Sequence, residues 1–270
     1  MGAIVWPALI VLSALGWMAP AMAGGPHLEE MTWVEVRDAL RAGKTTVIIA
    51  VGGTEQNGPH MTLGKHNTRV KVLAERIANQ LGNALVAPVI TYVPDGRISP
   101  PTEHMRFAGT ISIPEDAFMA MIDGAARSLA QHGFTDVVLI GDHGGYQDLL
   151  AEVASKFNRR AAASPARLHF ISAYYKTGRD PYRQLLRDNG LTDAQIGNHA
   201  GAGDTSEELA TDPSMVRLNQ LTITAGAAGW HALGVTGDPG PSTAALGKLG
   251  VDLIVSRSVQ EIRKAVDRAH

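Results

Sequence analysis

The chain has 270 residues, of which 45% are hydrophobic and 19% charged, which is enough for one large α/β domain with a substantial core. Its net charge of −2 and its 5% aromatic content supply neither a basic surface nor stacking rings, so we expect no nucleic-acid partner. The absence of cysteine excludes disulfides, thiolate metal sites and a cysteine nucleophile. Any metal site must therefore use His, Asp, Glu or Asn.

The first 26 residues carry no charged side chain. An apolar run over residues 4–17 leads to Ala21-Met22-Ala23, so we predict a signal peptide over residues 1–23. No Lys or Arg precedes the apolar run, and the uncharged stretch is about long enough to span a bilayer, so an uncleaved N-terminal anchor is the alternative. Either interpretation places the remaining single domain, residues 24–270, in the periplasm or outside the cell, with no other membrane contact.

Predicted strands and helices alternate along this domain. Continuous apolar, β-branched runs indicate buried strands, and segments with helical spacing lie between them. We expect strands at residues 45–51, 84–87, 109–113, 136–140 and 167–172. We expect helices at residues 32–42, 68–81, 114–132, 146–162 and 243–269. This order predicts an α/β fold with a parallel sheet covered by helices on both faces.

Polar loops follow two of the predicted strands, where sites form in parallel sheets, and a third lies further along the chain. They read Glu55-Gln-Asn57-Gly-Pro-His60-Met-Thr-Leu-Gly-Lys-His66, then Gly141-Asp142-His143-Gly-Gly145, then Asn198-His199-Ala-Gly-Ala-Gly-Asp204-Thr-Ser206. Imidazole and carboxylate are ligands for Zn²⁺, Mn²⁺ and Fe²⁺. No short metal motif such as His-Glu-x-x-His is present, so spacing alone leaves open whether these loops bind a metal.

The three loops resemble those of the creatininase (creatinine amidohydrolase) family. That family carries Glu-Gln-His-Gly-Pro-His-Leu-Pro-Leu with an Asp a few residues on, then a His-Gly-Gly loop, then His-Ala-Gly and Glu-Thr-Ser. The same order and spacing recur here over residues 31–269. The resemblance implies a three-layer α/β/α sandwich with a mostly parallel central sheet. It also implies two divalent metals at strand ends, hydrolysis of small cyclic or linear amides, and a homo-oligomer such as a hexamer.

The metal positions of this chain depart from the family pattern. Glu55 and His143 match family ligands, whereas Asn57 replaces a His, His66 replaces the bridging Asp, and Asp204 replaces a nearby Glu. A bridging carboxylate offsets the repulsion between two cations, which a neutral imidazole with one lone pair does not. We therefore predict one divalent ion (Zn²⁺, Mn²⁺ or Fe²⁺) per subunit, held by Glu55, His66 and His143. Asn57 and Asp204 complete the candidate set as further ligands or supporting groups.

The remaining site residues follow from the resemblance. His199 matches the family's catalytic His and would pass a proton to the leaving nitrogen. Glu103 is assigned to catalysis beside it, and His104 and Tyr174 to substrate binding. Other polar residues have structural interpretations: a turn for Asp142, a loop role for His60, a helix end for His132, a packed strand position for His169, a solvated helix face for Glu207-Glu208, and a pocket role left open for His231.

Two functions remain open at this stage. The first is a metal-dependent amidohydrolase that cleaves a C–N bond of a small-molecule amide, with creatinine itself disfavoured by the altered site. The second is a degenerate family member that binds a ligand without hydrolysing it. Retention of Glu55, His143 and His199 favours the enzyme, because a binding module has no need of all three groups.

Overall fold

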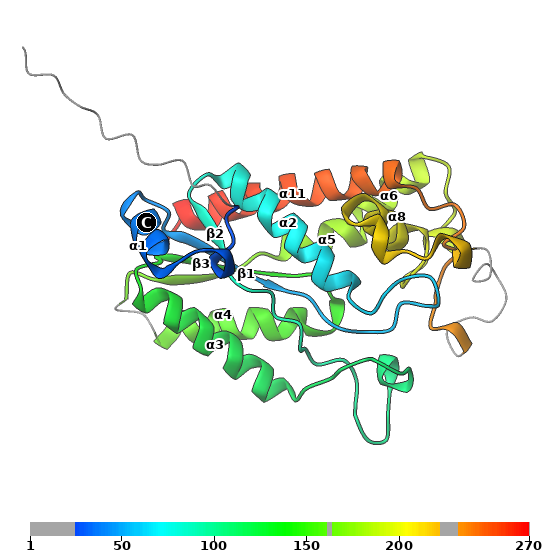
Figure 1. Ribbon diagram of the computed structural model, residues 1–270, viewed down its shortest axis with the longest axis horizontal. Coiled ribbons are helices and arrows are strands. Elements are labelled where there is room, and N and C mark those ends of the chain that lie inside the picture. The colour runs from blue at the N-terminus through cyan, green and yellow to red at the C-terminus, as the bar shows by residue number, and fades with distance from the viewer. Residues whose placement is uncertain (1–24, 161–163, 222–231, 270) are drawn as a thin grey trace, which may run out of the picture.

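A computed structural model describes residues 25–160, 164–221 and 232–269. Its centre is a four-stranded, fully parallel sheet in the order β2-β1-β3-β4 (Figure 1). The strands are β1 (Thr46–Val51), β2 (Ala84–Val86), β3 (Asp136–Gly141) and β4 (Arg167–Phe170). In the longest pairing, between β1 and β3, Thr46 lies opposite Asp136 and Val51 opposite Gly141. All residues of both central strands are buried, as their continuous apolar sequence predicts.

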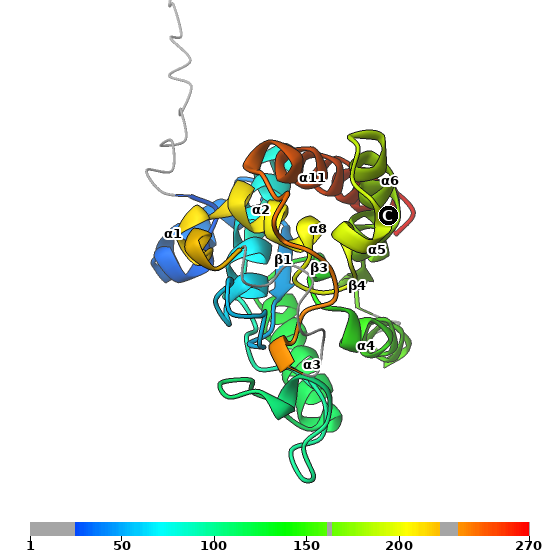
Figure 2. The same cartoon turned by 90° about the vertical axis from the view of Figure 1, so that its right-hand side faces the viewer.

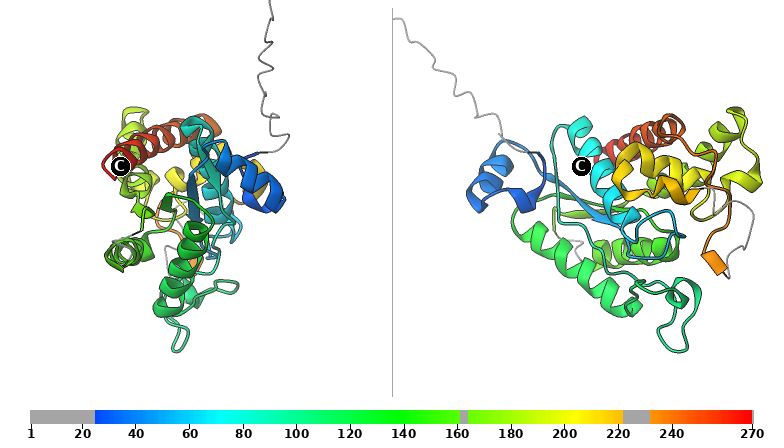
Figure 3. Two further views of the ribbon diagram at one scale, coloured as in Figure 1. Left: turned by 90° about the vertical axis from the view of Figure 1, so that its left-hand side faces the viewer. Right: turned by 45° about the vertical axis from the view of Figure 1, so that its right-hand side comes forward.

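Helices cover both faces of this sheet. The helices of the described residues are α1 (Trp33–Arg41), α2 (Lys65–Leu81), α3 (Glu115–Gln131), α4 (Gln147–Arg160), α5 (Ser172–Arg179), α6 (Pro181–Asp188), α7 (Asp193–Ile196), α8 (Ala202–Thr211) and α11 (Ala244–Asp267). Short 3-10 turns include η2 (Glu103–Arg106) and η3 (Gly144–Tyr146). Figure 3 shows α3 and α4 on one side of the sheet and α2 and α11 on the other. The α/β sandwich expected from the sequence is thus confirmed.

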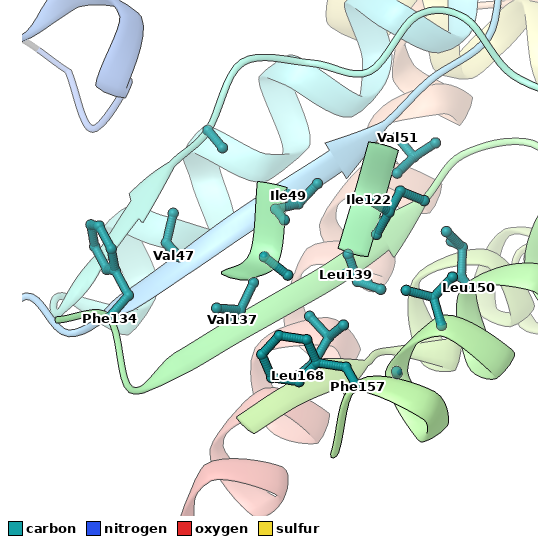
Figure 4. Packing of buried hydrophobic residues seen from close by; sticks show 14 of the residues in the cluster. Val47, Ile49, Val51, Ile122, Phe134, Val137, Leu139, Leu150, Phe157 and Leu168 are labelled. Atoms are coloured by element: carbon teal, nitrogen blue, oxygen red, sulfur yellow. The ribbon is translucent and has the colours of Figure 1, made fainter. Parts of the chain in front are cut away.

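The two faces of β1 and β3 define two separate cores. Val47, Ile49 and Val51 pack with Val137 and Leu139 against α3 and α4 (Figure 4). Alternate residues of the same strands, including Ile48 and Ile140, pack against α2, α5 and α11. Each fully buried Val, Leu or Ile contributes roughly 1.5–3 kcal/mol. The edge that bears the site loops is therefore held rigidly from both sides.

Two predicted elements differ from the structure by more than two residues. The strand predicted at residues 109–113 is wrong: only a single bridge joins Val93 to Ser112, and the amide of Ile111 donates to the carbonyl of Thr54, beyond the end of β1. The helix predicted to begin at residue 68 begins at Lys65, after Gly64. This earlier start places Lys65 and His66 on the first turn of α2, where their side chains enter the site.

The predicted signal peptide and His231 lie outside the described residues. Within the described ranges, no helix is both long enough and apolar enough to cross a bilayer.

Candidate active site

The first two polar loops lie side by side at the carboxyl edge of the sheet, the end that faces the viewer in Figure 2. Tyr146, which is fully buried, ties them together. Its hydroxyl lies 2.8 Å from the carbonyl oxygen of Val51 and 2.6 Å from that of Gly52, and it accepts from the amide of His143 at 3.0 Å. The ends of β1 and β3 therefore hold Glu55 and His143 in a fixed relation.

Glu55 is the centre of the site and is 1% exposed. Its Oε1 lies 2.9 Å from Nε2 of His66, and its Oε2 lies 2.8 Å from Nε2 of His143. Three further nitrogen groups surround it at 3.5–3.7 Å, those of Lys65, His104 and His199. Burial raises the pKa of Glu55, but His143, His66 and Lys65 outweigh that effect and hold the pKa well below the usual value. Glu55 is therefore an anion that attracts cations.

His66 lies between two carboxylates. Its Nδ1 is 2.5 Å from Oδ1 of Asp142, and its Nε2 faces Glu55. Both contacts are hydrogen bonds only when both ring nitrogens carry a proton, and a doubly protonated imidazole has no lone pair for a metal. His66 converges with Glu55 and His143, but it is placed as a bridge between two anions. Its assignment as a ligand stays a prediction.

Asp142 does more than the turn role expected from the sequence. It is buried, its Oδ2 accepts from Tyr174 Oη at 2.8 Å, and its Oδ1 lies 2.5 Å from Nη2 of Arg69. Burial raises the pKa of Asp142, but the opposite effect of Arg69 and His66 is larger and holds the pKa below its usual range. A fixed anion thus stands behind His66.

One group of side chains has the spacing of a metal site: Glu55, Asp95, His104 and His143. A tetrahedral site with bonds of about 2.0–2.1 Å separates its ligand atoms by about 3.3–3.4 Å. Oε2 of Glu55 lies 2.8 Å from Nε2 of His143 and 3.7 Å from Nε2 of His104. Oδ1 of Asp95 lies 3.9 Å from Nε2 of His143. These edges bracket the ideal length, so the four side chains fit one cation.

Asp95 was missed by sequence reasoning, because Pro94-Asp95-Gly96 is typical of a surface turn. Instead it is 4% exposed, and its Oδ2 is buried without a hydrogen-bond partner in the described residues. Burial, with the charge of Glu55, raises the pKa of Asp95 to about 7, although His143 opposes the shift. A buried carboxylate oxygen without a partner indicates room for a cation.

The side-chain amide of Gln56 contacts the rings of His104 and His199. Its Oε1 accepts from the amide of Gly58 at 3.0 Å, and its Nε2 donates to the carbonyl of Gly234 at 2.9 Å, which fixes the amide. Nε2 of Gln56 also lies 3.1 Å from Nδ1 of His104, so Nε2 of that ring faces Glu55. Gln56 therefore acts as a positioning residue that the sequence analysis overlooked.

The other two predicted ligands make different contacts. Asn57 is buried, and its Nδ2 donates to the carbonyls of Glu55 and Thr62, while its Oδ1 has no partner in the described residues. Asp204 lies 3.3 Å from Nζ of Lys65 and 3.4 Å from Nη1 of Arg69. Burial raises the pKa of Asp204, but these two cations hold it well below the usual value. Asp204 already has protein cations as partners.

His199 approaches Glu55 from the third loop. Its Nε2 is 3.0 Å from the carbonyl oxygen of Gln56, and its Nδ1 is 3.5 Å from Oε1 of Glu55. Its ring centroid is 4.5 Å from that of His104. Burial first, and Lys65 second, hold the pKa of His199 well below the usual value. The ring is therefore neutral near pH 7 and presents Nδ1 to the cluster as a proton acceptor.

A cavity of about 240 Å³ opens onto this cluster. His104, His143, His199 and Tyr174 are among the residues that line it, although Tyr174 is almost fully buried and directs its hydroxyl to Asp142. Glu103 is exposed at the start of η2, with a φ of 47°, and is not among the lining residues. Six predicted site residues thus share the cavity wall, namely His66, His104, His143, Tyr174, His199 and Asp204. Glu55, Asn57 and Glu103 are not among the lining residues.

The structure also shows the surroundings of the polar residues to which the sequence analysis gave structural roles. The solvated face expected for Glu207-Glu208 is wrong: both are buried, and burial raises each pKa to about 8. His60 is fully buried with Nε2 3.0 Å from Oγ1 of Thr205, and His169 lies 2.8 Å from Asp136. His132 ends α3, as expected.

Comparison with known proteins agrees with this fold. The family model for creatininase (creatinine amidohydrolase) matches residues 29–262. A creatinine amidohydrolase from Pseudomonas putida is 28% identical over 205 residues, 74% of this chain and 77% of that protein. A mycofactocin precursor peptide peptidase from Mycolicibacterium smegmatis is 29% identical over 224 residues, 75% of this chain and 78% of that protein. The chain belongs to the creatininase family.

The fold similarity extends to solved structures. A mutant creatininase described as its Zn-Zn type superposes with a TM-score of 0.73 and 24% identity, over 90% of this chain and 99% of the other.

Proposed function

We propose that this protein is a metal-dependent hydrolase that cleaves a C–N bond of a small amide with one divalent cation. The proposal rests chiefly on the four converging side chains Glu55, Asp95, His104 and His143, of which the two histidines line the cavity. Imidazole rings and carboxylates are the ligand types of Zn²⁺, Mn²⁺ and Fe²⁺. The relatives that carry names of hydrolases of C–N bonds support the same reaction class.

Protein cations argue for one ion rather than two. Lys65 is 1% exposed, and its Nζ lies 3.5 Å from Oε1 of Glu55, the oxygen that also faces His66. A divalent ion about 4 Å from an ammonium is repelled by about 8 kcal/mol at an effective dielectric constant of 20. The substitution of His66 for a bridging carboxylate removes the charge that would offset this repulsion. We therefore infer that Lys65 and His66 fill the place of a second cation.

A bound cation would lower the pKa of a water molecule and polarise the amide carbonyl. The protein's own groups then handle the proton. Nδ1 of His199 lies 3.5 Å from Oε1 of Glu55, and as a neutral ring His199 would accept a proton from the attacking water. The same nitrogen returns that proton to the leaving amine. Gln56 holds the ring for both steps through its backbone carbonyl.

The alternative is a family member that binds a ligand without hydrolysing it, favoured by the loss of two family ligands at Asn57 and His66. Thermal stabilisation separates the two functions, because a metal alone stabilises the enzyme, whereas small amides without metal stabilise the binding protein. We also propose, from the sequence, export to the periplasm or the medium and assembly into a homo-oligomer such as a hexamer.

The direct test is the metal content of the purified mature protein. We expect about one equivalent of metal by elemental analysis, loss of amide hydrolysis on chelation, and its return when metal is added back. Asp95→Asn and His143→Ala should each reduce the metal content, whereas His132→Gln, an exposed residue at the end of α3, should retain it. A wild-type protein that retains no metal, or two equivalents, contradicts the proposal.

A further inference from the structure

Helix α5 supplies four residues of the cavity wall, among them Tyr175 and Arg179. Tyr175 and Arg179 are four residues apart on this helix, so their side chains lie on one face, about 6 Å apart along its axis. Tyr175 covers Gly144, where an added Cβ would lie 2.3 Å from the tyrosine hydroxyl. Nη1 of Arg179 donates to the carbonyl of Asn198 at 3.2 Å. Together the two side chains bridge from the His143 loop to the His199 loop.

Arg179 differs from the other Lys and Arg side chains of the cavity wall in its charge balance. Lys65 pairs with Glu55 and Asp204, and Arg69 with Asp142, Asp204 and Glu207. Arg183 lies 3.4 Å from Asp193. Arg179 forms no ion pair with any described residue, and the residues beyond the described ranges contain no Asp or Glu. Among the described residues, its hydrogen-bond acceptors are the carbonyl and the side-chain oxygen of Asn198.

A half-buried guanidinium without an anion is costly unless a ligand supplies the anion. Asn198 accepts from only some of the five N–H donors of Arg179, which leaves the others for an anionic ligand. The planar fork of arginine matches the two oxygens of a carboxylate. The cavity is also small, at about 240 Å³, so a compact anion that enters it lies near Arg179, His143 and His199, which all line it.

We propose that Arg179 binds a carboxylate on the amine half of the substrate, so that the substrates are N-acyl amino acids or the C-terminal amide bonds of short peptides. This inference rests on the proposed hydrolase function. The position of Arg179 sets the polarity: it is bonded to Asn198, the neighbour of His199, which returns the proton to the leaving nitrogen. Water adds its oxygen to the acyl carbon, the C–N bond breaks, and the nitrogen gains a proton. The products are a carboxylic acid and an amino acid, with no change in oxidation state.

The test compares N-acetyl amino acids with their carboxamides, which differ only in the carboxylate. We expect the metal-loaded wild type to favour the acids in kcat/KM and in thermal stabilisation. Arg179→Gln should weaken the response to the acids by about 10- to 150-fold, the range for losing one hydrogen-bonded charge, and should weaken the response to the carboxamides much less, so that the acid preference is lost. Arg179→Lys should recover part of the loss. Arg187→Gln serves as the control, because Arg187 is an α6 residue paired with Asp193 and lies outside the cavity wall.

The two readouts separate the inference from the proposed function. Equal stabilisation of the wild type by acids and carboxamides across the panel, or an acid preference that survives in Arg179→Gln, overturns the role of Arg179. An acid preference in binding that depends on Arg179, with no hydrolysis of any compound, rejects the hydrolase and leaves a carboxylate-binding protein.

Discussion

The buried ammonium of Lys65 gives the sharpest test of the charge network around Glu55. Lys65→Met removes the charge and keeps most of the apolar stem. Nζ lies 3.5 Å from Glu55 and 3.3 Å from Asp204, and at an effective dielectric constant of 20 each contact is worth about 5 kcal/mol before desolvation. Removing one partner of a buried pair costs about 3–5 kcal/mol, because the remaining charge stays buried. At about 2–4 °C per kcal/mol, the metal-free melting temperature should fall by roughly 6–20 °C.

Metal should reverse this loss. Without the ammonium, Glu55 has one neighbouring cation fewer and the repulsion against a divalent ion is reduced, so a saturating divalent metal should raise the melting temperature of Lys65→Met more than that of the wild type. Differential scanning calorimetry with and without metal measures both effects. The control is Lys71→Met, which removes an exposed ion pair with Glu29 at 2.9 Å and should change stability by no more than about 1 kcal/mol. A metal-free melting temperature equal to that of the wild type would refute the buried pairing.

Three further predictions concern other parts of the network. Burial raises the pKa of Glu208 to about 8, so the folded protein favours the protonated form and its stability should fall as pH rises from about 4.5 to 8. In denaturant titrations, Glu208→Gln should reduce this pH dependence and stabilise the protein by about 3–5 kcal/mol at pH 8.5. An unchanged dependence of stability on pH would count against this account. Gly144→Ala should displace Tyr175 from the cavity wall and lower kcat/KM at least tenfold, with partial recovery in the double variant that also carries Tyr175→Ala. Purely additive losses would argue against the contact between Gly144 and Tyr175. His66→Ala should retain one equivalent of metal but lower stability by about 3 kcal/mol, since Asp142 and Glu55 lose a shared partner; loss of the metal would instead make His66 a ligand.

The sequence predicts the parts of the fold that depend on local patterns. The runs at β1 and β3 are apolar on both faces, and this alone indicates central strands of a parallel sheet. The error at residues 109–113 has a physical origin: a β-branched run forms a strand only where a neighbour offers a backbone edge, and this segment lies past the end of β1.

The site divides in the same way. Glu55, His143 and His199 could be found because glycine-rich motifs surround them. Asp95 could not, because its turn-like neighbours conceal a long-range contact with His143 that only the folded chain creates. Lys65 was also overlooked, since a lysine is almost never fully buried unless it is paired, and its partners Glu55 and Asp204 are 10 and 139 residues away in sequence. Burial of Glu207 and Glu208 likewise depends on packing of α8 against α11 rather than on local sequence.

The central claim is that one cation is held by Glu55, Asp95, His104 and His143, with Lys65 and His66 filling the remaining space beside Glu55. Anomalous X-ray scattering from crystals of the metal-loaded protein tests this claim most directly. We predict one anomalous peak within about 2.0–2.2 Å of all four side chains. Two peaks, or one peak coordinated by His66 or Asp204, would contradict it.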